Sequence, residues 1–210
     1  MKSRVTSGVH RRHSFLLCLV VLAGCGGDGG LRSQPPVGFT LREVKGSGFA
    51  IALPQRWRSL DRNSALTGER VSRFARANPR LRAELRVLAG PNSPIELIAV
   101  DSARSQSFAA NMNVIQTRVP GNLSFAQLSR NDPTQIKLVS SVRNMRQATV
   151  ELPAGRALRL TYDVRPRGVV YQYFVKHHDF LYVLTYTTST AAAPRYAKIF
   201  DLSAHTFQLR

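Results

Sequence analysis

His177, His178 and Asp179 form the densest group of side chains with reactive chemistry in this sequence. Two imidazoles and a carboxylate are ligands that transition metals accept, so the triplet can be interpreted as part of a metal site. Adjacent residues on a strand point to opposite faces, however, and a third ligand would have to come from elsewhere in the chain. The triplet separates two strand-like segments, which favours a hairpin turn with exposed histidines. We therefore predict no metal site and no cofactor.

The sequence lacks the common motifs of catalysis. It contains no Gly-x-Ser-x-Gly nucleophile motif, no His-Glu-x-x-His zinc motif and no phosphate-binding P-loop. Only 12 residues are acidic, and most are isolated, so paired carboxylates would require assembly over long range. These observations predict a protein that is not an enzyme.

The N-terminal segment has the organisation of an export signal. Several basic residues precede an apolar run over residues 15–22. This run is too short to span a bilayer, which needs about 20 apolar residues. The pattern therefore predicts a signal peptide over residues 1–24.

The four residues Leu22-Ala23-Gly24-Cys25 resemble the lipobox of bacterial lipoproteins. The resemblance implies that the thiol of Cys25 receives lipid and that cleavage makes Cys25 the first residue of the mature chain. Since two or more acyl chains anchor stably, we predict membrane attachment through Cys25 on the extracytoplasmic face of the cell membrane. An ordinary secretory signal with a chance cysteine is the alternative. The Arg11-Arg12 pair leaves twin-arginine export open, although Phe-Leu is displaced by one residue.

The composition of the remaining chain predicts its domain organisation. Residues 25–37 are rich in glycine and end in two prolines, as in a short flexible tether. No second linker follows, so residues 38–210 are predicted to form a single domain. With Cys18 removed and Cys25 lipidated, the mature chain has no thiol left for a disulfide, and its fold must depend on a hydrophobic core.

The formal charge is +18, and removal of the four basic residues of the leader lowers it to +14. A basic surface is attracted to anionic membranes. Nucleic acid is the usual other partner of such a protein, but predicted export and the absence of a nucleic-acid-binding motif argue against it.

Alternation, turn residues and helical spacing predict the secondary structure. Strands are expected at residues 39–44, 49–54, 95–101, 113–119, 146–152, 157–164, 169–176 and 180–188. Helices are expected at residues 64–88 with a break at Asn78-Pro79, and at residues 123–128, 133–142 and 192–202. In the strand at residues 49–54, apolar residues alternate with alanine, which predicts one buried face and one small face.

Two groups of residues are candidates for binding. Arg73, Arg76 and Arg80 have helical spacing and would share one side if the helix continued through Pro79, so they are candidates for an anionic surface. A solvated helix face is the competing interpretation.

Trp57, Asn111 and Asn113 are candidates for a ligand or partner surface. Tyr162, Tyr171 and Tyr173 could line a pocket with Trp57. Aromatic residues of this kind more commonly pack in a core, and asparagines more commonly stabilise turns.

The order of these segments resembles the PsbP-like superfamily, which includes the LpqN-type lipoproteins of actinobacteria and the DcrB-type proteins. One matching segment is an apolar strand followed by Pro-x-x-Trp, at residues 49–57. Another is Asn-x-Asn-Val at residues 111–114, which falls where that family often has the same motif before a helix. The strands within residues 155–186 and the aromatic positions Tyr196, Phe200 and Phe207 also match. The resemblance implies an α/β sandwich of the α+β type, with an antiparallel sheet and helices on both faces. Members of this superfamily are mostly non-enzymatic accessory or binding proteins at membranes, and the resemblance implies a role of the same kind.

We therefore expect a membrane-anchored extracytoplasmic lipoprotein that serves as a non-catalytic binding or accessory module for an envelope protein complex. The second hypothesis is a carrier or sensor of a small apolar or anionic envelope ligand, such as a lipid or cell-wall precursor. The third is an enzyme acting on envelope polymers, which would need a concave site that gathers acids or the two histidines.

Overall fold

The computed structural model describes residues 34–65, 68–77, 79–90, 92–102, 109–138, 141–166 and 168–210. These residues belong to one unit, Ser33–Arg210. The predicted leader, Cys25 and most of the tether lie outside the described residues, so the assignments made for them stay predictions. Within the described ranges, no helix has the length and apolar character needed to cross a membrane.

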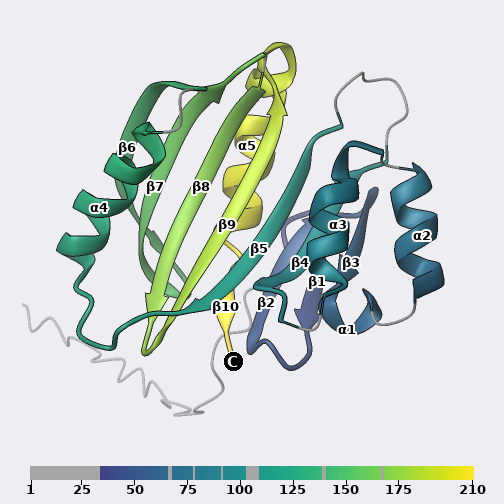
Figure 1. Ribbon diagram of the computed structural model, residues 1–210, viewed down its shortest axis with the longest axis horizontal. Helices are drawn as coiled ribbons and strands as arrows, with labels where there is room; N and C mark the ends of the chain where they lie inside the picture. The colour runs from purple at the N-terminus through teal and green to yellow at the C-terminus, as the bar shows by residue number, and fades with distance from the viewer. Residues whose placement is uncertain are drawn as a thin grey trace, which may run out of the picture. The chain divides into compact units, whose positions relative to one another are not determined.

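A seven-stranded antiparallel sheet is the largest element of the fold (Figure 1), with the strand order β3-β4-β5-β9-β8-β7-β6. Its strands are β3 (Trp57–Asp61), β4 (Ile95–Asp101), β5 (Asn111–Arg118), β6 (Val142–Leu152), β7 (Gly155–Val164), β8 (Gly168–His177) and β9 (Phe180–Ser189). Strands β6 to β9 follow one another as a meander. Valine, threonine and tyrosine are frequent in β8 and β9 and fit the half-buried surface of a pleated sheet.

A smaller sheet has the order β1-β2-β10 and consists of β1 (Phe39–Val44), β2 (Phe49–Pro54) and β10 (Gln208–Leu209). The turn between β1 and β2 contains Gly46 and Gly48 with φ of 83° and 66°, a conformation that glycine adopts without steric cost. The prediction of one buried and one small face for β2 needs correction. Every residue from Phe49 to Leu53 is buried, because β1 and β10 flank this strand and helix α5 packs against it.

The small sheet and helix α5 (Ala193–Ala204) cover one face of the large sheet. Tyr196, Phe200 and Ser203 form the buried stripe of α5, with the three- and four-residue spacing of a helix face. The ring of Phe200 stacks on Tyr186 at a centroid distance of 5.0 Å and on Tyr196 at 5.5 Å. This aromatic packing determines where α5 lies on the sheet.

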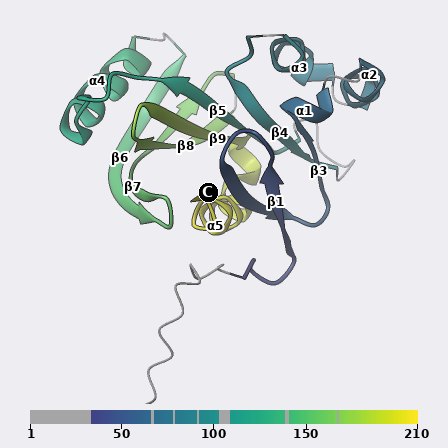
Figure 2. The same ribbon diagram turned by 90° about the horizontal axis from the view of Figure 1, so that it is seen from below.

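Two groups of helices cover the opposite face, as Figure 2 shows. One is α4 (Phe125–Lys137), which packs on β6 and β7. The other packs near β3 and β4 and consists of α1 (Arg62–Ala65), α2 (Gly68–Ala77), the short 3-10 helix η1 (Pro79–Leu81) and α3 (Arg82–Leu88). The predicted α+β sandwich, with an antiparallel sheet and helices on both faces, is confirmed.

Helix α4 differs from the sequence prediction of two helical pieces. It begins with a capping box, in which Ser124 and Gln127 exchange side-chain to backbone hydrogen bonds. It then continues through Pro133, which cannot donate a backbone hydrogen bond to the carbonyl of Ser129. The side-chain amide of Gln147 in β6 donates to that carbonyl instead, at 3.1 Å. A contact from a distant strand therefore compensates for the proline.

Two other elements also differ from the expectation. Strand β3 was not predicted, although Trp57 and Leu60 in it are buried. The helical segment predicted at residues 64–88 begins earlier, at Arg62, and is divided into α1, α2, η1 and α3. Short buried pieces of this kind carry too few residues for a periodic pattern to be recognised.

Candidate functional site

An open hollow of about 610 Å³ lies between α5 and strands β6, β7 and β8. It is termed the α5 groove below. Its volume falls in the range of small-molecule sites, roughly 300–1,000 Å³. Its charged and aromatic lining consists of Arg146, Arg159, Tyr171, Tyr173, Lys198 and Asp201.

The strand register arranges the sheet side of the α5 groove in two cross-strand rows. From β6 to β8, these rows are Arg146–Thr161–Tyr171 and Ala148–Arg159–Tyr173. Paired side chains have Cβ atoms about 5 Å apart, and diagonal neighbours lie about 7–8 Å apart. Arg146 and Arg159 are therefore near enough for both guanidinium groups to reach one ligand. The small side chains of Ala148 and Thr161 leave room between them.

A β-bulge near the start of β6 helps to set this arrangement. The register with β7 shifts between Arg143 and Arg146, and Asn144 within the bulge has a φ of 51°. The amide of Asn144 donates to Asp163 Oδ2 at 2.7 Å. Because a bulge re-aims the side chains that follow it, Arg146 comes to lie opposite Thr161 on the groove face.

Helix α5 forms the other wall of the groove. Ala197, Lys198 and Asp201 line the hollow, and their three- and four-residue spacing places them on one side of the helix. The adjacent stripe of Tyr196 and Phe200 is buried. The core packing of α5 therefore decides which of its polar residues face the sheet.

Asp201 already has three partners. Its Oδ1 atom accepts hydrogen bonds from Tyr173 Oη at 3.2 Å and from Arg159 Nη1 at 3.4 Å, and His205 Nδ1 lies 3.6 Å away. The side chains of Arg159 and Asp201 are 37% and 45% exposed. Water therefore screens their ion pair, which contributes less than about 1 kcal/mol. A ligand can therefore replace Asp201 as the partner of Arg159 at little cost in free energy.

Arg146 and Lys198 are exposed, and neither side chain forms an ion pair or hydrogen bond with another described residue. Among the described residues, the lining of the groove thus has three cations and one carboxylate, a net of two positive charges. The site is suited to hold an anion.

Tyr171 and Tyr173 form an aromatic wall in the groove. Tyr171 is half-buried and meets the ring of Phe200 edge-on at 5.4 Å, whereas Tyr173 is fully buried. Burial raises the pKa of Tyr171, while Arg146 and Arg159 lower it in part. Burial and Asp201 raise the pKa of Tyr173. Both phenols are therefore protonated at neutral pH, and Tyr171 can donate a hydrogen bond to a bound anion.

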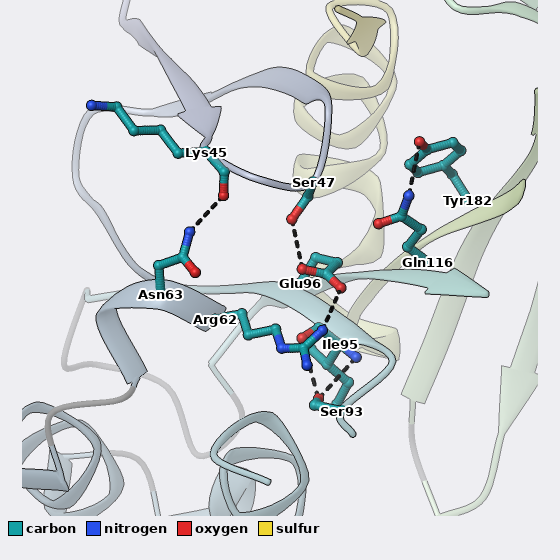
Figure 3. A network of polar contacts seen from close by, with 9 residues as sticks. All are labelled: Lys45, Ser47, Arg62, Asn63, Ser93, Ile95, Glu96, Gln116 and Tyr182. Atoms are coloured by element: carbon teal, nitrogen blue, oxygen red, sulfur yellow. Dashed lines mark hydrogen bonds and ion pairs between the residues drawn. The ribbon is translucent and has the colours of Figure 1, made fainter. Parts of the chain in front are cut away.

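A second polar region, termed the Glu96 cluster, consists of Glu96, Ser47 and Arg62 (Figure 3). Glu96 is only 7% exposed and lies at a register irregularity in β4. Ser47 Oγ donates to its Oε2 atom at 2.6 Å, and Arg62 Nη1 donates to Oε1 at 3.3 Å. Both carboxylate oxygens thus have partners from the chain itself. The cluster joins the β1–β2 turn, α1 and β4, which favours a structural role.

The predicted candidates Trp57, Asn111 and Asn113 do not come together. Trp57 is 4% exposed and packs edge-on against Phe200 at 6.2 Å, so its ring belongs to the core. Asn111 and Asn113 lie in β5, on the other face of the sheet, where Asn113 pairs with Ile98. The Asn-x-Asn-Val segment is therefore part of strand β5, and the next element along the chain is helix α4.

The two asparagines also differ in their contacts. The amide of Asn111 donates to the carbonyl of Ala109 at 3.2 Å. The Oδ1 atom of Asn113 is buried without a hydrogen-bond partner among the residues described. Neither contact brings a ligand-binding group to the α5 groove.

The predicted grouping of Arg73, Arg76 and Arg80 also changes. Arg73 and Arg76 are exposed on α2, and Arg73 Nη2 lies 2.6 Å from Glu69 Oε1. Arg80 belongs to η1, and its side chain lies outside what is described. Because α2 ends at Ala77 and Pro79 begins η1, the three arginines do not follow one continuous helix face. Their anionic-surface role stays a prediction.

The predicted turn at His177-His178-Asp179 is confirmed. His177 is the last residue of β8, and His178 and Asp179 form the turn to β9. The two imidazole rings lie 4.2 Å apart. Within the described ranges, no group of three or more histidine, cysteine or acidic residues is arranged to hold a metal ion.

Sequence reasoning considered Tyr171 and Tyr173 as pocket residues but missed Arg146, Arg159 and Lys198. One signal was available for Arg159, which occupies an inward position between Ala157 and Thr161 in the alternation of β7. A charged residue at such a position indicates a gap in the core. Nothing in the sequence pairs it with Lys198.

No protein-family model matches this chain, and no curated protein matches its sequence. Among solved structures, the chain is similar to CyanoP, the cyanobacterial PsbP protein of Synechocystis sp. PCC 6803, with a TM-score of 0.52, 14% identity, and coverage of 90% of this chain and 99% of CyanoP. It is also similar to LpqN of Mycobacterium tuberculosis, with a TM-score of 0.53, 9% identity, and coverage of 81% and 90%. Fold and groove together define an α+β sandwich like those of PsbP and LpqN, with an open basic site beside its last long helix.

Proposed function

We propose that this protein is a lipid-anchored, extracytoplasmic and non-catalytic binding module, and that the α5 groove holds a group of its envelope partner. The observation that carries this proposal is the concave site in which Arg146 and Lys198 lie beside an aromatic wall and have no partners among the described residues. Concave sites with a few convergent polar groups are the usual form of binding sites. The groove contains one carboxylate and neither His177 nor His178, which supports binding over catalysis.

The membrane location in this proposal depends on Cys25. The lipobox-like residues before it support the anchor, and LpqN, a protein of similar fold, is involved in cell envelope biogenesis. Growth with a clickable fatty acid tests the anchor directly. The wild type should be labelled and stay with membranes, whereas Cys25→Ala should lose both properties. A Cys25→Ala protein that is still labelled contradicts the anchor.

The partner is tested by affinity purification of the tagged, lipidated protein from crosslinked native membranes at low and high salt. We expect one stoichiometric protein that survives high salt with the wild type. The double variant Arg146→Gln/Lys198→Gln should lose it. Arg58→Gln, an exposed arginine in β3 at the opposite edge of the sheet from β6, is the matched control and should retain it. Equal capture by both variants contradicts a role for the groove.

A carrier or sensor of a small anionic ligand is the second candidate function. The volume of the groove, about 610 Å³, favours it, because this space suits a small molecule as well as one side chain of a partner. Native mass spectrometry of the purified protein separates the two. A bound small molecule that disappears in the double variant supports the carrier, and a ligand-free protein that captures its partner supports the accessory module.

A further inference from the structure

We infer that the α5 groove recognises a phosphate ester of a small organic molecule. The inference rests on the proposed function only in taking the α5 groove as the binding site. It adds the chemical class of the ligand, which follows from the charge of the groove, the placement of its cations and its aromatic wall.

The charge of the groove fits a phosphate monoester. Its three cations and one carboxylate leave two positive charges. A phosphate monoester has a charge of about −1.5 to −2 at pH 7, whereas a carboxylate supplies only one negative charge. A monoester therefore compensates the groove almost completely.

The donors also approach from two sides. Arg146 and Arg159 extend from neighbouring strands β6 and β7, and an arginine guanidinium forms two parallel hydrogen bonds to phosphate oxygens. Lys198 extends from α5 on the opposite wall and adds a compact point charge. An anion between these walls can meet all three cations at once.

The rest of the groove indicates an organic part of the ligand. The half-buried ring of Tyr171, together with Ala148 and Ala197, gives the hollow an apolar portion beside the cations. A bare phosphate leaves this portion in water. A ligand with a ring or sugar attached to the phosphate covers it.

Asp201 gives the inference a distinctive signature, because it competes with the ligand for Arg159. The two residues are 3.4 Å apart and partly exposed, so the pair is weak. Removal of the negative charge of Asp201 should therefore tighten binding of an anion. A carboxylate with a purely structural role would produce the opposite result.

The test is isothermal titration calorimetry of the purified full-length protein in neutral detergent, with phenyl phosphate, inorganic phosphate, benzoate and mixed detergent micelles that contain phosphatidic acid. Phenyl phosphate should bind more tightly than inorganic phosphate or benzoate. Arg146→Gln and Lys198→Gln should each weaken it roughly tenfold, the effect of losing one hydrogen bond to a charged group. Asp201→Asn should tighten it several-fold, and Arg58→Gln should leave it unchanged.

Several results would overturn the inference. Equal losses of phenyl phosphate affinity in Arg146→Gln and Arg58→Gln would show that the ligand is attracted by net charge alone. Weaker binding by Asp201→Asn would show that Asp201 does not compete with the ligand for Arg159. Equal affinity for inorganic phosphate and phenyl phosphate would show that the groove does not recognise an organic part of the ligand. Binding only to the mixed micelles that contain phosphatidic acid would identify a lipid headgroup and exclude a small soluble ester.

The outcome also separates this inference from the proposed function. If the double variant loses its membrane partner while no variant changes phenyl phosphate binding, the groove is the binding site but its ligand is of another class. If phenyl phosphate binding responds as expected while partner capture does not, the ligand class holds and the accessory role fails.

Discussion

The Glu96 cluster and the α5 groove each combine a carboxylate with an arginine and a hydroxyl group. In the Glu96 cluster, Ser47 and Arg62 meet the side chain of Glu96, which is 9% exposed. In the α5 groove, Tyr173 and Arg159 meet the side chain of Asp201, which is 45% exposed. The same three kinds of group therefore occur in two environments that differ mainly in their access to water.

This difference separates stability from binding. A buried carboxylate that loses a hydrogen-bond partner cannot replace it with water and is left unsatisfied. Each contact in the Glu96 cluster therefore stabilises the fold. Water compensates the groups of the α5 groove when a contact breaks, so those contacts contribute little to stability. The groove can therefore keep cations available for a ligand.

Glu96→Ala should show the largest effect. Loss of the carboxylate removes hydrogen bonds from Ser47 and Arg62, each to a charged group, and should lower the free energy of unfolding by about 2–3 kcal/mol. Urea denaturation measures this change. Glu43→Ala, which removes an exposed carboxylate 3.4 Å from Arg210, is the matched control and should cost less than about 1 kcal/mol. Equal effects of the two variants would contradict the comparison.

Ser47→Ala should have the next largest effect. It leaves Glu96 Oε2 buried without its donor at 2.6 Å, which should cost about 1–2 kcal/mol. The double variant with Glu96→Ala should be less destabilised than the sum of the single variants, because both remove the same contact. Strict additivity in urea denaturation would show that the two side chains are not coupled.

Asp201→Ala should lower stability by only about 0.5–1 kcal/mol, since its ion pair with Arg159 is partly exposed. The coupling energy between Arg159 and Asp201 in a double-mutant cycle should be smaller than that between Ser47 and Glu96. Urea denaturation of both cycles makes the comparison direct. A larger coupling in the groove would show that its carboxylate is structural.

Arg146→Gln and Lys198→Gln should change the free energy of unfolding least, by within about 0.5 kcal/mol. Both side chains are exposed and unpaired within the described part of the chain, so their removal breaks no contact that holds the fold. Thermal unfolding at low and high salt checks this expectation. A loss above about 1 kcal/mol, outside the usual range of surface substitutions, would assign these residues to the fold instead of the binding site.

Sequence patterns predicted much of the fold but little of the groove. Strands β1, β2 and β4 have the predicted bounds, because alternation and turn residues act within a few neighbouring positions. The predicted separation of two helices at residues 129–132 was wrong, because α4 is continuous there and Gln147 satisfies the carbonyl of Ser129. That contact joins a helix and a strand, and no local pattern reports it.

By itself, the sequence determined the β-meander and the turn at His178, since these follow from local periodicity and turn chemistry. Only the tertiary structure decided that Trp57 is buried against Phe200 and that Arg146, Arg159 and Lys198 share one hollow. The bulge in β6 sets the position of Arg146, strand pairing places Arg159 beside it, and aromatic packing of α5 brings Lys198 to the opposite wall. Such long-range packing depends on many weak contacts acting together, so it cannot be deduced from the spacing of the three residues along the chain.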